Sequence, residues 1–222
     1  MATSYIFNKI IRTLQKEYGA KQDQDFPALM IYSLPLNDFT ETGFITMKTS
    51  DTIFDQLLTG IKKLEETGCE LIVITCNTTH FFYDMLQKSV HVPVINLIDE
   101  TSHVAKSNGI NRALVLSSRS TRDLGLYSKA LSEIGLDCIN ITDTEQTELD
   151  TIILNIMGGT QSNKDITLME EMLGKYSKLG ADGLIVGCTE ISVIIDTINS
   201  PITIVDSAET AVRKVINHSR II

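Results

Sequence analysis

Two cysteines stand in polar segments whose residue types could carry acid–base chemistry. Cys76 begins the run Cys-Asn-Thr-Thr-His over residues 76–80, and Cys188 begins Cys-Thr-Glu over residues 188–190. Each cysteine follows a short apolar run that predicts a buried strand. Ligands of open α/β sheets bind at the carboxyl ends of the strands, and the positive end of a following helix can lower the pKa of a thiol. Both cysteines are therefore candidate catalytic residues.

The two cysteines occupy matching places in an internal repeat. Residues 64–76 align with residues 176–188, and in both a predicted helix ends at a glycine, which is followed by an acidic residue, an apolar strand and the cysteine. The glycine precedes the cysteine by the same number of residues in both halves. Two related lobes explain such a repeat, and two facing lobes would bring the thiols to opposite sides of one cleft.

A pair of thiols on opposite sides of a cleft can invert a stereocentre. One thiolate removes a proton from one face of a carbon atom, and a thiol delivers a proton to the other face. Two neighbours could tune these thiols, and each has a structural alternative. His80 either tunes Cys76 or caps its helix. Glu190 either tunes Cys188 or is a carboxylate favoured by the helix dipole.

Helical and strand periods alternate along the whole chain. The pattern predicts helices over residues 3–17, 51–67, 121–134, 145–157 and 165–179, with others starting near 79 and 207. It predicts strands over 27–32, 71–74, 92–98, 113–116, 138–141, 184–186 and 202–205. This alternation is typical of an α/β fold with parallel sheets. We expect a first lobe formed by residues 1–98 and 207–222 and a second lobe formed by residues 99–206, each a parallel sheet flanked by helices.

The repeat exposes a gap in the first lobe. The second lobe is predicted to open with strand 113–116, a polar turn and a helix, whereas the first lobe opens directly with helix 3–17. Either the first lobe has fewer strands, or the sequence given starts after its first strand. A gap in the middle of a parallel sheet would leave backbone groups without partners. We therefore favour the second explanation.

Composition excludes several classes of protein. The chain has 222 residues, of which 43% are hydrophobic and 21% charged, so it is neither disordered nor fibrous. A formal charge of −9 without a basic stripe argues against nucleic acid as a partner. No apolar run is long enough to span a membrane, and no secretory signal pattern is present, so we expect a cytoplasmic protein with reduced thiols. No cysteine or histidine spacing predicts a metal site.

Both cysteine motifs resemble those of a known family. Thr-Cys-Asn-Thr-Thr-His over residues 75–80 and Gly-Cys-Thr-Glu-Ile over residues 187–191 are similar to the two signature segments of the aspartate/glutamate racemase family. The resemblance covers nearly the whole chain, with the motifs in the same order. It implies a two-lobed α/β fold and racemisation of an acidic amino acid with no pyridoxal phosphate and no metal. It also implies a homodimer, because members of the family are often dimeric.

The resemblance assigns roles to residues of this sequence. Cys76 and Cys188 would be the paired acid–base residues. The turn over residues 116–121 is similar to the family's turn after the first strand of the second lobe, where Thr121 would reach the ligand and Ser118 would support the site. The residues implied to bind the substrate, or to support the site from that turn, are Asn77, Thr78, Thr79, Thr121, Thr189 and Ser118.

The sequence departs from the family pattern at three places. The family begins with a strand and a glycine-rich turn before an Ala-Thr pair, whereas this sequence begins Met-Ala-Thr. Phe39 stands where the family often has arginine, and residues 156–159 contain no lysine. Such cations would pair with a side-chain carboxylate of the substrate. Two alternatives therefore stay open: a non-catalytic binding protein with the same cleft, and a decarboxylase or isomerase of small diacids that uses the same cysteines.

Overall fold

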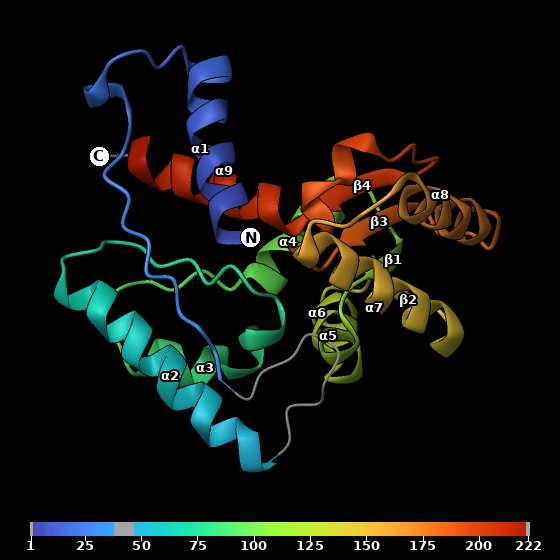
Figure 1. The fold of residues 1–222 in the computed structure, drawn as a ribbon, viewed down its shortest axis with the longest axis horizontal. Helices are drawn as coiled ribbons and strands as arrows, with labels where there is room; N and C mark the ends of the chain where they lie inside the picture. Colours follow the sequence, from blue (N-terminus) through green and yellow to red (C-terminus); the bar gives the residue numbers. More distant parts are fainter. Residues whose placement is uncertain (1, 38–46, 221–222) are drawn as a thin grey trace.

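The structure is a computed structural model that describes residues 2–37 and 47–220. Figure 1 shows two lobes, with α1, α2, α3 and α9 in the first and the labelled strands in the second. The strands are β1 (Arg112–Leu116), β2 (Asp137–Asn140), β3 (Gly183–Val186) and β4 (Thr203–Asp206). The helices are α1 (Ala2–Tyr18), α2 (Met47–Glu66), α3 (Tyr83–Lys88), α4 (Leu97–Ser107), α5 (Arg119–Asp123), α6 (Leu126–Glu133), α7 (Asp143–Gly158), α8 (Asn163–Lys178) and α9 (Ser207–Arg220).

The second lobe is built around a parallel sheet with the strand order β2-β1-β3-β4. β1 and β3 lie in the middle and are apolar on both faces, as expected for strands that helices cover from both sides. Leu114 and Leu116 pack against α7 and α8, whereas Ala113 and Val115 pack against α4 and α6. This lobe confirms the predicted α/β class with a parallel sheet flanked by helices (Figure 1).

The first lobe is dominated by helices. α1 packs on α9 through an apolar face that includes Ile6, Ile10 and Leu14. α2 buries its own apolar face against residues 72–94, which include the short helix α3. α4 contacts both α6 and α9 and so joins the two lobes. The lobe boundaries that the sequence suggests stay a prediction.

Three predictions of strands in the first lobe are wrong, because these segments do not form strands. Residues 27–32 are extended but belong to no strand, and 71–74 and 92–98 pair only at one parallel bridge, between Ile72 and Val94. An apolar run becomes a strand only if a neighbouring backbone accepts and donates its hydrogen bonds. The prediction for 92–98 also runs too far, because α4 begins at Leu97, and the sequence pattern did not predict this helix.

Two predicted helices are broken. The helix expected over 121–134 consists of α5 and α6, because Gly125 adopts a left-handed conformation with φ +65°. The helix expected from residue 79 consists of a 3-10 turn (Thr78–Phe82) followed by α3. Within the described ranges, no helix combines the length and apolar character that crossing a membrane requires.

Candidate active site

Cys188 lies at the carboxyl edge of the parallel sheet. Gly187 separates it from β3, as the sequence predicts, and its side chain is buried. Its Sγ donates a hydrogen bond to Oε2 of Glu190 at 3.4 Å. Thr189 Oγ1 also lies 3.4 Å from this carboxylate oxygen. A carboxylate that accepts from a thiol can exchange a proton with it, so Glu190 stands where the sequence places a tuning group.

Cys76 follows the extended segment 71–75 and is half-buried. The two cysteine loops are joined directly, because Thr189 Oγ1 donates to the backbone oxygen of Thr75 at 2.9 Å. The residue after Cys188 therefore contacts the residue before Cys76. This hydrogen bond links the two repeat motifs across the lobes.

Asn77 is held by both lobes. Its Nδ2 donates to Ser207 Oγ at 3.2 Å, and Tyr127 Oη on α6 donates to its Oδ1 at 2.7 Å. All three side chains are buried. Burial raises the pKa of Tyr127 well above its usual range, so the phenol keeps its proton and acts as a donor. The Asn77 amide thus fixes the start of the loop after Cys76.

Three hydroxyl groups form a second contact between the lobes. Thr78 Oγ1 lies 2.8 Å from Thr121 Oγ1 and 3.1 Å from Ser118 Oγ, and those two hydroxyls lie 3.2 Å apart. Ser118 also caps α5, with its side chain accepting from the backbone of Thr121. All three side chains are buried. The structure therefore brings together residues that the sequence places in different lobes, and their hydroxyls are engaged with one another.

Thr79 and His80 both contact the backbone oxygen of Cys76. Thr79 Oγ1 donates to the Cys76 oxygen at 2.9 Å, and His80 Nδ1 lies 2.9 Å from the same oxygen. His80 Nε2 lies 3.3 Å from the backbone oxygen of Ile95. Burial lowers the pKa of His80, so the ring is neutral at neutral pH and donates through one nitrogen only. These contacts favour a positioning role for both side chains.

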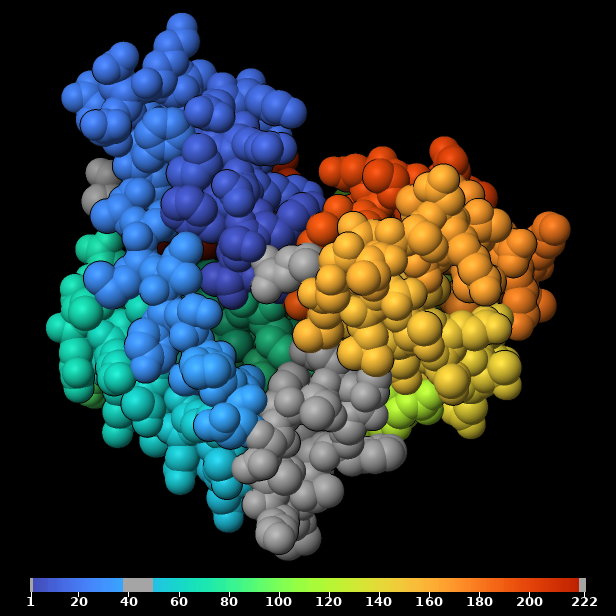
Figure 2. All heavy atoms as spheres, in the orientation of Figure 1, coloured from blue at the N-terminus to red at the C-terminus, as the bar shows by residue number. Residues whose placement is uncertain are grey.

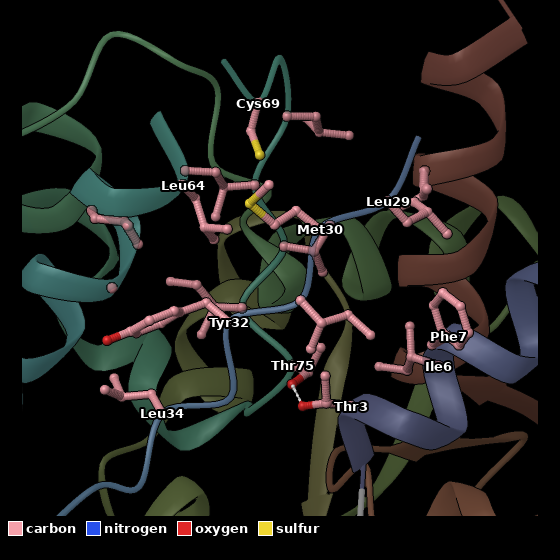
Figure 3. Close-up of a pocket in the computed structure, with 18 of the residues that line it drawn as sticks. Thr3, Ile6, Phe7, Leu29, Met30, Tyr32, Leu34, Leu64, Cys69 and Thr75 are labelled. Atoms are coloured by element: carbon pink, nitrogen blue, oxygen red, sulfur yellow. Dashed lines mark hydrogen bonds between the residues drawn. The ribbon is translucent and has the colours of Figure 1, made fainter. Parts of the chain in front are cut away.

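Sequence reasoning missed three partners of the predicted residues. Thr75, Tyr127 and Ser207 hold Thr189 and Asn77 in place. Tyr127 lies on a helix far along the chain, so no local pattern relates it to Asn77. Ser207 follows β4 directly and could have been placed from that strand end, where ligands of parallel sheets gather. Thr3, at the start of α1, joins this edge through a 2.9 Å contact with Thr75 (Figure 3).

A buried carboxylate lies beside this network. Asp206 Oδ1 accepts from Ser192 Oγ at 2.5 Å and from the Ala208 amide at 2.9 Å. Its Oδ2 has no hydrogen-bond partner among the described residues and lies 3.7 Å from Lys9 Nζ. Burial raises the pKa of Asp206. In the described ranges, no three histidine, cysteine or acidic side chains gather in a way that could hold a metal ion.

Comparison with known proteins assigns the chain to a family. The sequence profile of the Asp/Glu/hydantoin racemase family matches residues 1–215. The chain is 31% identical, over 93% of its length and 88% of the relative's, to the broad specificity amino-acid racemase RacX of Bacillus subtilis (strain 168).

Two solved structures share the fold over nearly the whole chain. The crystal structure of an aspartate racemase homologue from Pyrococcus horikoshii OT3 superposes with a TM-score of 0.81 and 30% identity, covering 99% of this chain and 94% of that one. The Picrophilus torridus aspartate racemase gives 0.78 and 25%, covering 97% and 89%. With the profile match and the likeness to RacX, these findings establish that the chain belongs to the Asp/Glu/hydantoin racemase family.

Proposed function

We propose that Cys76 and Cys188 racemise an amino acid by a two-base mechanism, with aspartate or glutamate among the substrates. Membership of the family gives amino-acid racemisation as the class of reaction. The observation that carries the assignment to these two residues is the hydrogen bond from Thr189 to Thr75, since it joins the neighbours of both cysteines. A racemase of this kind needs one acid–base group on each face of the substrate Cα.

The contacts of Cys188 suggest which thiol starts as the acid. When its Sγ donates to Glu190, Cys188 holds its proton. Cys76 then removes the α-proton as a thiolate, the electron pair stays on the substrate Cα and its carboxylate, and Cys188 delivers its proton to the opposite face. To restore the starting state, Cys76 loses the substrate proton to solvent, and Glu190 is placed to return a proton to Cys188. In the opposite direction the two thiols exchange roles.

The proposal also states that the side chain of the substrate is acidic. An acidic side chain would be favoured by a nearby cation, but two candidates from the second lobe are engaged with the protein's own carboxylates. Arg119 pairs with Asp150 at 2.8 Å, and Arg122 pairs with acidic residues on α5 and α7. Phe39 lies outside the described residues. The aspartate racemase of Picrophilus torridus supports an acidic substrate, whereas the broad specificity in the name of RacX supports a wider range of amino acids.

Exchange of the α-proton in D₂O, followed by NMR and chiral chromatography, tests the proposal. Both enantiomers of aspartate, glutamate, alanine and methionine would be incubated with the protein, with no pyridoxal phosphate or metal added. We expect deuterium to enter the α position as the opposite enantiomer forms, with aspartate or glutamate among the compounds that react. Inversion of the neutral amino acids alone would refute the acidic class, and no inversion of any compound would refute the racemase assignment.

A further inference from the structure

Arg119 lies across the carboxyl edge of the parallel sheet. It begins α5 directly after Ser118, whose hydroxyl contacts Thr78 of the Cys76 loop at 3.1 Å. Its side chain reaches Asp150 on α7, which covers the face of the sheet opposite to α6. Figure 2 shows the atoms of α7, in yellow and orange, at the surface on the side of the second lobe that faces the first. Ligands of parallel sheets bind at this edge, so the arginine stands where a substrate would be held.

The guanidinium group of Arg119 is anchored along one edge. Nε donates to Asp150 Oδ2 at 2.8 Å, and Nη2 donates to Thr147 Oγ1 at 3.0 Å. Nη1 has no hydrogen-bond partner among the described residues, and the side chain is 23% exposed. A guanidinium group carries five N–H donors in a fixed fork. The edge formed by Nη1 and Nη2 is therefore open to a second acceptor.

A buried network holds this anchor in place. Gln146 Nε2 donates to Asp150 Oδ1 at 2.9 Å and to the backbone oxygen of Ser117 at 3.0 Å. Asp150 Oδ1 also accepts from the backbone amide of Arg119 at 3.3 Å. Both Gln146 and Asp150 are buried, and a fully satisfied buried network is rigid. The backbone and the anchored edge of Arg119 are thus fixed together, so the open edge keeps one direction.

The neighbouring cation does not offer the same donors. Nε and Nη2 of Arg122 both contact Asp123, and Nη2 also lies 3.0 Å from Asp143. Two carboxylates share this guanidinium group, whereas Arg119 pairs with one. Of the two arginines on this turn, Arg119 is therefore the better placed to bind a further anion.

We propose that Arg119 determines substrate specificity by binding the side-chain carboxylate of an acidic amino acid through Nη1 and Nη2. Arginine recognises a carboxylate by two parallel N–H donors of this kind. Asp150 has a second role, because it neutralises the charge of Arg119 and so weakens the attraction for an anion. A neutral side chain is then tolerated better than it would be beside an arginine without a counter-charge. The identity of the ligand rests on the proposed racemase function, whereas the open edge of Arg119 rests on its contacts.

Binding of aspartate and asparagine tests this role, because the two amino acids have nearly the same shape and differ in charge. Racemic mixtures would be titrated by calorimetry, so that racemisation does not change their composition. The double variant Arg119→Gln with Asp150→Asn removes both charges together and leaves no buried carboxylate without its partner. Asp150→Asn alone keeps the arginine and removes its counter-charge. Arg112→Gln is the matched control, since Arg112 pairs with Asp137 at the amino end of β1.

The parent chain should bind aspartate about tenfold more tightly than asparagine, a factor that one charge-assisted hydrogen bond can supply. We expect this preference to disappear in the double variant and to rise severalfold in Asp150→Asn. Arg112→Gln should keep the preference of the parent chain. Urea denaturation would show that each variant is folded.

An unchanged preference in the double variant, or no preference for aspartate in the parent chain, would overturn the role of Arg119. So would a preference that does not rise in Asp150→Asn, which is the decisive variant if the double variant does not fold. An equal loss in Arg112→Gln would overturn it too, since overall charge would then be the cause.

Racemisation is measured separately on the same chains, so the two proposals fail separately. A preference that depends on Arg119 in a chain that racemises nothing would leave the role of Arg119 standing and refute the proposed function. Racemisation of aspartate with a preference that ignores Arg119 would do the reverse.

Discussion

The hydroxyl of Tyr127 offers a sharp test of how the lobes hold the Cys76 loop. Replacing Tyr127 by phenylalanine keeps the ring but removes the 2.7 Å hydrogen bond to Asn77 Oδ1. Both groups are buried, so the amide oxygen loses a partner that water does not readily replace. Leaving a buried polar group without its partner costs about 1–3 kcal/mol. A loss near 2 kcal/mol lowers the Tm of a chain of this size by about 4–8 °C.

The same change should slow catalysis, because Asn77 directly follows Cys76. A penalty of about 1.4 kcal/mol in the transition state lowers kcat tenfold, so we expect kcat to fall at least ~10-fold in both directions. Tyr176→Phe is the matched control. Tyr176 is also buried and donates at 2.7 Å, to Glu145, but it packs among α7 and α8 in the second lobe.

Urea denaturation would give the stability of both variants, and chiral chromatography would give their rates from D and L substrate. The expected pattern is a similar loss of stability in Tyr127→Phe and Tyr176→Phe, with kcat reduced only in the first. Unchanged kcat in Tyr127→Phe, or an equal loss of kcat in Tyr176→Phe, would refute a positioning role for the bond between Tyr127 and Asn77.

Two further changes test the electrostatics and packing of the second lobe. Burial opposes ionisation of Glu145, but hydrogen bonds from three neighbouring side chains outweigh it and lower its pKa from 4.5 to about 2. A lowered pKa adds stability that is fully present above the unfolded pKa and is lost as the pH falls through the folded pKa. Glu145→Gln should therefore cost about 1–2 kcal/mol at pH 7 relative to exposed Glu148→Gln, and most of this difference should be lost by pH 2 in urea melts. A difference that is independent of pH would contradict this. Gly187→Ala would place a methyl group 2.7 Å from the Tyr127 ring and should lower stability by about 1–3 kcal/mol in thermal melts. The control Gly174→Ala has open space around the added methyl group and should not lower stability. Equal Tm values for the two variants would contradict this reasoning.

The sheet of the second lobe could be predicted from the sequence because its strands form backbone hydrogen bonds with one another. The apolar runs at 113–116 and 184–186 lie side by side in the sheet, so local pattern and tertiary pairing agree. The runs at 27–32 and 71–74 have the same local character, but among the described residues no backbone hydrogen bond joins them. A periodicity argument detects which residues suit a strand and does not detect whether a partner lies beside them.

The candidate site was predictable where the repeat marks it. Cys76 and Cys188 were found because each follows an apolar run and a glycine at the same spacing, and the structure joins their loops. Tyr127 and Ser207 were not found as partners of Asn77, because hydrogen bonds between residues 50 and 130 positions apart leave no trace in the local pattern. Geometry from the folded chain was needed to relate them.

The central claim is that one thiol serves each face of the substrate. Solvent deuterium exchange with the single variants Cys76→Ala and Cys188→Ala tests it most directly. Cys138→Ala is the control. Each variant keeps one thiol and so one face. We predict that both lose inversion by at least ~10²-fold, and that deuterium then enters the α position of one enantiomer in Cys76→Ala and of the opposite enantiomer in Cys188→Ala. Inversion that persists in either variant, or exchange of the same enantiomer by both, would contradict the two-thiol account.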